Sequence, residues 1–148
     1  ATISSDAYRR GMHSLNPAII VKSVAAPLLV PIVEEGLQDE PIAEAAVQLY
    51  LGGISKNPPD ILLLACTHYP LIKKTLKKQL PQSVSIIDSA ESCAKFATSK
   101  ISELGIEAGS GQKGSERFFV TDMPGNFYAQ ARRFLGGDLE SFEKISLE

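Results

Sequence analysis

The spacing of apolar residues changes from segment to segment along the chain, and this spacing predicts alternating helices and strands. Residues 61–66 form an unbroken run, Ile-Leu-Leu-Leu-Ala-Cys, which is typical of a strand buried on both faces. Residues 69–80 instead carry apolar side chains at helical spacing with lysines between them, which indicates an amphipathic helix. The same analysis predicts the other elements: helices over 6–15, 41–51, 89–104 and 126–136, a short helix or turn over 27–36, and strands over 18–26, 83–88, 117–122 and 142–148.

Turn and capping residues mark where several of these elements begin and end. Ser4 and Ser5 predict a serine cap on the first helix, and Pro41 stands at a preferred first helical position. Residues 105–116 are rich in glycine and serine and resemble a linker. The alternation of strands and helices predicts an α/β fold with a mostly parallel sheet flanked by helices. In such sheets the chemistry collects at the carboxyl ends of the strands.

Composition and charge exclude several classes of protein. The 148 residues suit one domain or two small lobes, and the 44% of hydrophobic residues is enough for a core. A net charge of −2 gives no electrostatic footprint for nucleic acid, and no apolar run approaches the roughly 20 residues of a membrane span. No secretory signal is visible, and two cysteines make no disulfide framework, so we expect a cytoplasmic protein. The chain lacks an initiator methionine, so we expect either removed residues or a piece of a longer protein.

Cys66 is the strongest candidate for chemistry, because it stands where the apolar run 61–66 stops and a helix is expected to begin. The free N–H groups at a helix N-terminus favour a thiolate over a thiol. A cysteine that ends an apolar strand is more often buried and inert. The polar residues Thr67 and His68, which follow at once, favour the functional interpretation here.

The other candidates allow structural interpretations beside functional ones. His68 either tunes the thiol or caps a helix, and Glu34 and Glu35 are most simply solvated charges at a helix end. Cys93 lies within a predicted helix at core spacing, and Asp88 suits an N-cap. Four lysines indicate a solvated helix face: Lys73, Lys74, Lys77 and Lys78.

Several better-defined motifs are absent from the sequence. A cysteine phosphatase loop needs an arginine six residues after its cysteine, where this chain has Ile72. A zinc site built on Cys66 and His68 lacks a convincing second pair, since only His13 and Cys93 remain, and we expect no metal. No nucleophile elbow, Walker loop or dinucleotide-binding loop occurs. An activated cysteine could then either attack a substrate covalently or transfer a proton to and from carbon.

Five segments together resemble the glutamate racemases. The segment ACTHYPLI at 65–72 resembles the second cysteine motif of that family, usually GCTHYP, with Ala65 in place of the glycine. AAPLLVPIVEEG resembles the family's ACPLFVPLVEEG, with Ala26 in place of a non-catalytic cysteine. Three further segments also resemble segments of the family: 1–17, 85–96 and 117–136.

The family's N-terminal motifs are absent: an Asp-Ser motif, a Pro-Tyr-Gly motif and a first catalytic cysteine within A-C-N-T-A. The resemblance implies two similar α/β lobes with glutamate between them. By that pattern, residues 1–90 would form the second lobe, and 91–148 would return to a first lobe whose N-terminal part is missing. The sequence thus resembles the C-terminal portion of a glutamate racemase.

The resemblance implies cofactor-independent racemisation of L-glutamate to D-glutamate by two cysteines that act on opposite faces of Cα. Cys66 would be one of them and would contact the substrate together with Thr67. His68 would assist the thiol, and Glu34 would be the nearby acid, although Glu35 is adjacent. Cys93, expected in a core, would not be the second cysteine. This chain alone is therefore expected to be inactive.

The resemblance also implies a setting and partners. D-glutamate would supply peptidoglycan in the bacterial cytoplasm and so maintain cell shape. The partners would be glutamate and the N-terminal half of the same enzyme, without nucleic acid or membrane, and a homodimer stays open. The alternatives are a related aspartate or hydantoin racemase, or a non-catalytic half-protein that serves as a binding module.

Overall fold

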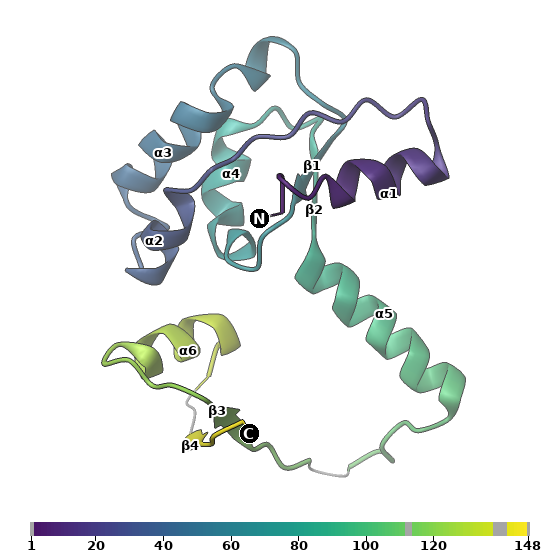
Figure 1. Ribbon diagram of the computed structural model, residues 1–148, viewed down its shortest axis with the longest axis vertical. Coiled ribbons are helices and arrows are strands. Elements are labelled where there is room, and N and C mark those ends of the chain that lie inside the picture. The colour runs from purple at the N-terminus through teal and green to yellow at the C-terminus, as the bar shows by residue number, and fades with distance from the viewer. Residues whose placement is uncertain (1, 112–113, 138–141, 148) are drawn as a thin grey trace.

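A computed structural model of the chain describes residues 2–111, 114–137 and 142–147 (Figure 1). Helices and strands alternate through most of it, as the α/β prediction requires. The α-helices are α1 (Ala7–Leu15), α2 (Leu29–Glu34), α3 (Pro41–Leu51), α4 (Lys73–Gln79), α5 (Ser89–Leu104) and α6 (Phe127–Leu135). The 3-10 helices are η1 (Ile54–Lys56) and η2 (Tyr69–Ile72), and the strands are β1 (Ile61–Leu64), β2 (Ser85–Asp88), β3 (Phe118–Val120) and β4 (Phe142–Lys144).

The strands form two separate parallel pairs. β1 pairs with β2 in a register that sets Ile61 opposite Ser85 and Leu64 opposite Asp88. β3 pairs with β4, with Phe118 opposite Phe142. Parallel strands flanked by helices confirm the predicted fold class, although among the described residues the strands make two small sheets in place of one large one.

The main core lies around the β1–β2 pair. Its buried apolar residues come from α2, α3, β1, η2 and α4 and from the segment before α2: Ala26, Leu29, Ile32, Val33, Ala43, Ala46, Val47, Leu64, Ile72 and Leu76. Thr75 is also buried, and its hydroxyl donates to the carbonyl of Gln38 at 2.7 Å, which satisfies a polar group inside this core. The core therefore holds the two loops that follow β1 and α2 against each other.

One predicted strand and the predicted serine cap do not form, and β1 to β4 are shorter than the predicted ranges 61–66, 83–88, 117–122 and 142–148. Residues 18–26 form no strand, and Ile20 is 87% exposed, because no neighbouring strand supplies ladder hydrogen bonds to this β-branched segment. The first helix has Asp6 at its N-cap without a side-chain bond, although the hydroxyl of Ser5 accepts weakly from the amide of Ala7 at 3.4 Å. Parts of two other predicted elements lie outside the described residues: 112–113 of the linker-like loop, and position 148 at the end of the last strand.

The helix predicted over 69–80 begins as the 3-10 turn η2, and its α-helical part starts only at Lys73. Pro70 stands at the start of η2, where its missing N–H costs no hydrogen bond. Three of the four lysines are exposed, as expected. Lys73 is an exception, since only 25% of its side chain is exposed and it pairs with Asp88 and Glu91.

Helix α5 extends away from the β1–β2 core (Figure 1). The prediction that Cys93 packs in a core is wrong for this chain, because Cys93 is exposed and α5 has no buried residue. Phe96 and Leu104 on the same helix are 64% and 66% exposed. The core spacing in the sequence is real, but no element of the described chain covers this face of α5.

Asp88 joins β2, α5 and α4 through one buried carboxylate. One oxygen accepts from the amide of Glu91 at 2.7 Å, which confirms the predicted N-cap of α5, and the other accepts from Lys73 Nζ at 2.8 Å. The Glu91 amide and the Lys73 ammonium lower the pKa of Asp88, and its carboxylate in turn raises the pKa of Lys73. The side chain is only 4% exposed, so solvent screens these contacts little.

Replacing Asp88 tests how far this carboxylate stabilises the fold. Asp88→Ala removes the cap and the ion pair, and we expect the free energy of unfolding to fall by about 2–3 kcal/mol. Asp88→Asn keeps an efficient cap but loses the charge, so its loss should be smaller. Urea denaturation at pH 7 measures both variants, with Glu103→Gln on the exposed face of α5 as a control within about 0.5 kcal/mol of the parent.

The same variants should differ in their response to acid. The folded-state pKa of Asp88 is lowered, so its contribution is complete above the unfolded value of about 3.9 and is lost as the pH falls through the folded value. The stability of Asp88→Asn should therefore decline less than that of the parent between about pH 5 and pH 3. Equal acid sensitivity of the two proteins would contradict this account.

Candidate active site

The loop that follows β1 carries the predicted motif, and hydrogen bonds of Tyr69 fix its position. Cys66 lies two residues beyond the end of β1, at the carboxyl end of the strand. The carbonyl of Cys66 accepts from the amide of Tyr69 at 3.3 Å, which closes a tight turn. The Tyr69 hydroxyl donates to the carbonyl of Ala26 at 3.0 Å, so the turn is anchored to the segment before α2. Burial, and secondarily the nearby Cys66, raise the pKa of the Tyr69 phenol, which keeps it a neutral donor.

His68 connects the thiol to a carboxylate. Its Nδ1 lies 3.9 Å from Cys66 Sγ and 3.4 Å from the Thr67 hydroxyl, and its Nε2 lies 3.3 Å from Glu34 Oε1. With the proton on Nε2 donated to Glu34, Nδ1 is free to accept a proton from the thiol. The arrangement therefore places one imidazole between a thiol and a carboxylate, as a proton-transfer site requires.

The structure brings together all four of the predicted site residues: Cys66, Thr67, His68 and Glu34. It also distinguishes the two adjacent glutamates by position. Glu34 ends α2 and reaches His68, whereas Glu35 stands one residue further on and is exposed. The expected helix dipole contributes less than the sequence suggested, because η2 is a single turn and α4 begins seven residues after Cys66. His68 is thus the main local group that can act on the thiol.

Two residues at this site escape prediction from the sequence. Arg133 Nη1 donates to the carbonyl of Glu34 at 2.7 Å, and the Phe134 ring stands perpendicular to the His68 ring at 5.3 Å between centroids. Both come from α6, and Arg133 is 99 residues from Glu34 along the chain. No local sequence pattern indicates a contact between residues so far apart along the chain. Arg133 and Phe134 lie within the segment 117–136, which resembles part of the family sequence.

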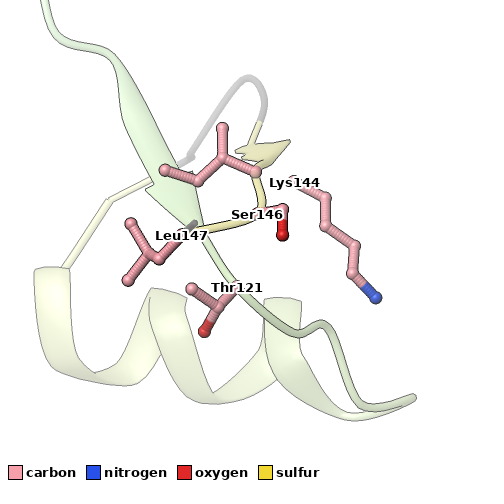
Figure 2. Close-up of a pocket in the computed structure, with 5 residues that line it drawn as sticks. Thr121, Lys144, Ser146 and Leu147 are labelled. Atoms are coloured by element: carbon pink, nitrogen blue, oxygen red, sulfur yellow. The ribbon is translucent and has the colours of Figure 1, made fainter.

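A separate cavity lies at the carboxyl ends of β3 and β4 (Figure 2). Its volume is about 480 Å³, and it is lined by Thr121, Lys144, Ile145, Ser146 and Leu147. None of these side chains is a thiol, an imidazole or a carboxylate, so the cavity offers no acid–base pair comparable to that at Cys66. We therefore take the Cys66 cluster as the candidate active site.

The part of the chain that the structure describes offers neither a metal-binding group nor a membrane-spanning helix. No group of three or more histidine, cysteine, aspartate or glutamate side chains in residues 2–111, 114–137 and 142–147 could hold a metal ion. Within the same ranges, no helix has both the length and the apolar character that crossing a membrane requires.

Comparison with known proteins finds relatives over almost the whole chain but no family model. No protein-family model matches the chain. Glutamate racemase from Geobacter metallireducens is 35% identical over 147 residues, and that from Neisseria meningitidis serogroup C is 36% identical over 146 residues. Each match covers 99% of this chain and 54% of the relative, so the chain spans about half the length of the curated relatives it matches.

Solved structures agree with the sequence matches. Glutamate racemase from Francisella tularensis, in complex with D-glutamate, superposes with a TM-score of 0.86 at 33% identity. The match covers 98% of this chain and 54% of the Francisella chain. A glutamate racemase isoform from Bacillus anthracis gives a TM-score of 0.84 at 35% identity, and the match covers 99% of this chain and 54% of the Bacillus chain. Across almost its whole length the chain is thus related to the glutamate racemases, and it matches about half of such a protein, consistent with a C-terminal portion.

Proposed function

We propose that the protein to which this chain belongs interconverts L- and D-glutamate without a cofactor, and that Cys66 is one of its two acid–base groups. The observation that carries this proposal is the line of contacts from Cys66 through His68 to Glu34, built on the motif that resembles the family's second cysteine motif. Similarity to glutamate racemases over 99% of the chain supports the substrate class.

Racemisation inverts the configuration at Cα, so one group must remove the α-proton and another must return one to the opposite face. In one direction the Cys66 thiolate takes the α-proton and becomes a thiol, and the electron pair of the C–H bond passes into the substrate carboxylate. A thiol on the other face then gives its proton to Cα. In the other direction Cys66 is the donor. His68 receives or supplies the Cys66 proton between turnovers, and Glu34 stabilises the imidazolium that forms.

Thr67 is exposed beside His68 and would bind the polar groups of glutamate together with Cys66. The Francisella relative is described in complex with D-glutamate, which supports a substrate of this size and charge. D-glutamate made in this way would supply peptidoglycan synthesis, and so cell shape, in a bacterial cytoplasm.

The second acid–base group would come from outside these 148 residues. Cys93 is the one other cysteine of the sequence, and it is exposed on α5, which extends away from the core (Figure 1). We propose that residues 1–90 form one lobe and that residues 91–148 pack with an N-terminal half of the same enzyme. The exposed apolar face of α5, with Phe96 and Leu104, supports such a partner.

Two alternatives predict different results in the same assay. A related aspartate or hydantoin racemase would use the same acid–base groups on another substrate. A binding module would hold glutamate without converting it. Incubating the full-length protein with L-glutamate, L-aspartate and a hydantoin, each in D₂O, separates them: deuterium should enter only glutamate at Cα, and incorporation into none would favour a binding module.

The two cysteines should differ sharply when each is replaced in the full-length protein. Cys66→Ser should lower racemisation in both directions by at least about 10²- to 10⁴-fold, because a serine hydroxyl does not ionise near neutral pH. Its glutamate affinity, measured by calorimetry, should change little. Cys93→Ser should keep its rate. An inactive Cys93 variant beside an active Cys66 variant would refute the assignment.

The two glutamates give a matched pair. Glu34→Gln keeps the shape of the side chain but removes the charge beside His68, so kcat should fall by about 10- to 100-fold. Glu35→Gln is the control at an exposed position and should stay within about twofold. Steady-state racemisation and thermal melting of both variants measure these effects, and a larger loss for Glu35→Gln would reverse the assignment.

The 148-residue chain by itself should not racemise glutamate, because it supplies a proton-transfer group to one face of Cα only. Circular dichroism of L-glutamate incubated with the purified chain measures this directly, and the full-length protein is the positive control. Sustained conversion by the chain alone would show that both acid–base groups lie within it.

A further inference from the structure

Helix α6 contacts the candidate active site through two adjacent residues near its C-terminus. Arg133 reaches the end of α2, and Phe134 reaches the imidazole of His68. Neither residue touches Cys66 in the contacts described, so neither is placed to exchange a proton with a substrate. Their contacts instead fall on the two groups that act through Cys66, namely Glu34 and His68.

The Arg133 contact completes the C-terminus of α2. The last carbonyls of a helix lack partners within it, and a cationic donor there is favoured by both hydrogen bonding and the helix dipole. The Arg133 guanidinium donates to the Glu34 carbonyl at 2.7 Å and lies against Gly36. Gly36 has φ of 76°, and a Cβ at this position would collide with the guanidinium. One guanidinium thus contacts the backbone at the end of α2 at two positions, Glu34 and Gly36.

The Phe134 contact fixes the imidazole itself. Its ring meets the His68 ring at an interplanar angle of 89° and a centroid distance of 5.3 Å, an edge-to-face geometry that is favourable for aromatic pairs. Glu34 already holds Nε2, and Cys66 and Thr67 lie at Nδ1. Phe134 therefore adds an apolar contact to a ring whose nitrogen atoms have polar neighbours. Only 24% of the His68 side chain remains exposed.

We infer that Arg133 and Phe134 are positioning residues, which hold Glu34 and His68 in line with the Cys66 thiol when α6 docks against α2. This inference rests on the proposed function, because it concerns the same proton transfer. Displacement of α6 would leave the thiol in place but would free the imidazole to turn away from it. Loss of either residue should therefore slow the proton transfer more than it weakens substrate binding.

Kinetics of the full-length protein test the inference. Phe134→Leu should lower kcat by about 10- to 100-fold, since a misplacement of about 1 Å at a catalytic group has effects of this size, while KM for glutamate stays within about twofold. Phe134→Tyr keeps the ring and should restore most of the rate. Ala129→Ser, a small change at an exposed position of the same helix, is the control and should leave both constants unchanged.

Arg133→Ala supplies a second, independent variant in case Phe134→Leu fails to fold, as judged by far-ultraviolet circular dichroism and melting temperature. It should show the same split between kcat and KM. Because both residues act on one docked arrangement, the loss in the double variant should be smaller than the product of the two single losses. The inference would be overturned if the loss in the double variant equalled the product of the two single losses, or if only KM changed.

Nuclear magnetic resonance of the imidazole protons separates this inference from the proposed function. In the full-length protein, the His68 signals are assigned from their absence in His68→Gln. They should move in Phe134→Leu and return in Phe134→Tyr, while those of His13, which contacts the Ile19 carbonyl, should not move. A shift with unchanged kcat, or no shift, would overturn the inference alone. A folded parent with the His68 shift but without racemisation would overturn the proposed function, and with it the inference.

Discussion

The parallel pairing of β1 with β2 is the constraint on which the rest of the structure depends. Parallel strands end at the same edge of a sheet, so the register that sets Leu64 opposite Asp88 brings the loop after β1 beside the N-terminus of α5. The loop carries Cys66, and the Asp88 carboxylate caps α5 and binds Lys73. Because Lys73 starts α4, the segment between the thiol and that helix is fixed at both ends. The turn that carries Cys66 is thus short and anchored, and Thr67 within it is exposed.

A thiol in this position is useful only if a neighbouring group can exchange protons with it. In the proposed function His68 would meet that need, because its two nitrogen atoms face different partners, the Cys66 sulfur on one side and the Glu34 carboxylate on the other. Three elements that are not adjacent in sequence meet around this ring: the turn after β1, the end of α2 and the end of α6. The position of the His68 ring therefore depends on tertiary packing and not on the motif alone.

The sequence predicted those features that depend on local pattern. The cap at Asp88 and the helix over 89–104 have short-range signals, and both are found in the structure. The apolar run 61–66 forms a strand only over Ile61–Leu64, and of these residues only Leu64 is buried. The strand over 18–26 fails because β-propensity cannot tell whether a partner strand is present. The burial of Cys93 fails for a related reason, since helical spacing shows which face is apolar but not what covers it. Arg133 and Phe134 could not be predicted, because their contacts depend on how α6 docks.

Gly36 shows how a local and a distant requirement can fall on one residue. Asparagine tolerates a left-handed backbone better than most residues, so the φ of 76° alone would leave some choice at this position. The guanidinium of Arg133 adds a second requirement, because it occupies the space that a β-carbon would need. A side chain at position 36 would therefore displace the end of the Arg133 side chain from its present place. The contact that Arg133 makes with the Glu34 carbonyl at the end of α2 thus depends on the absence of a side chain at position 36.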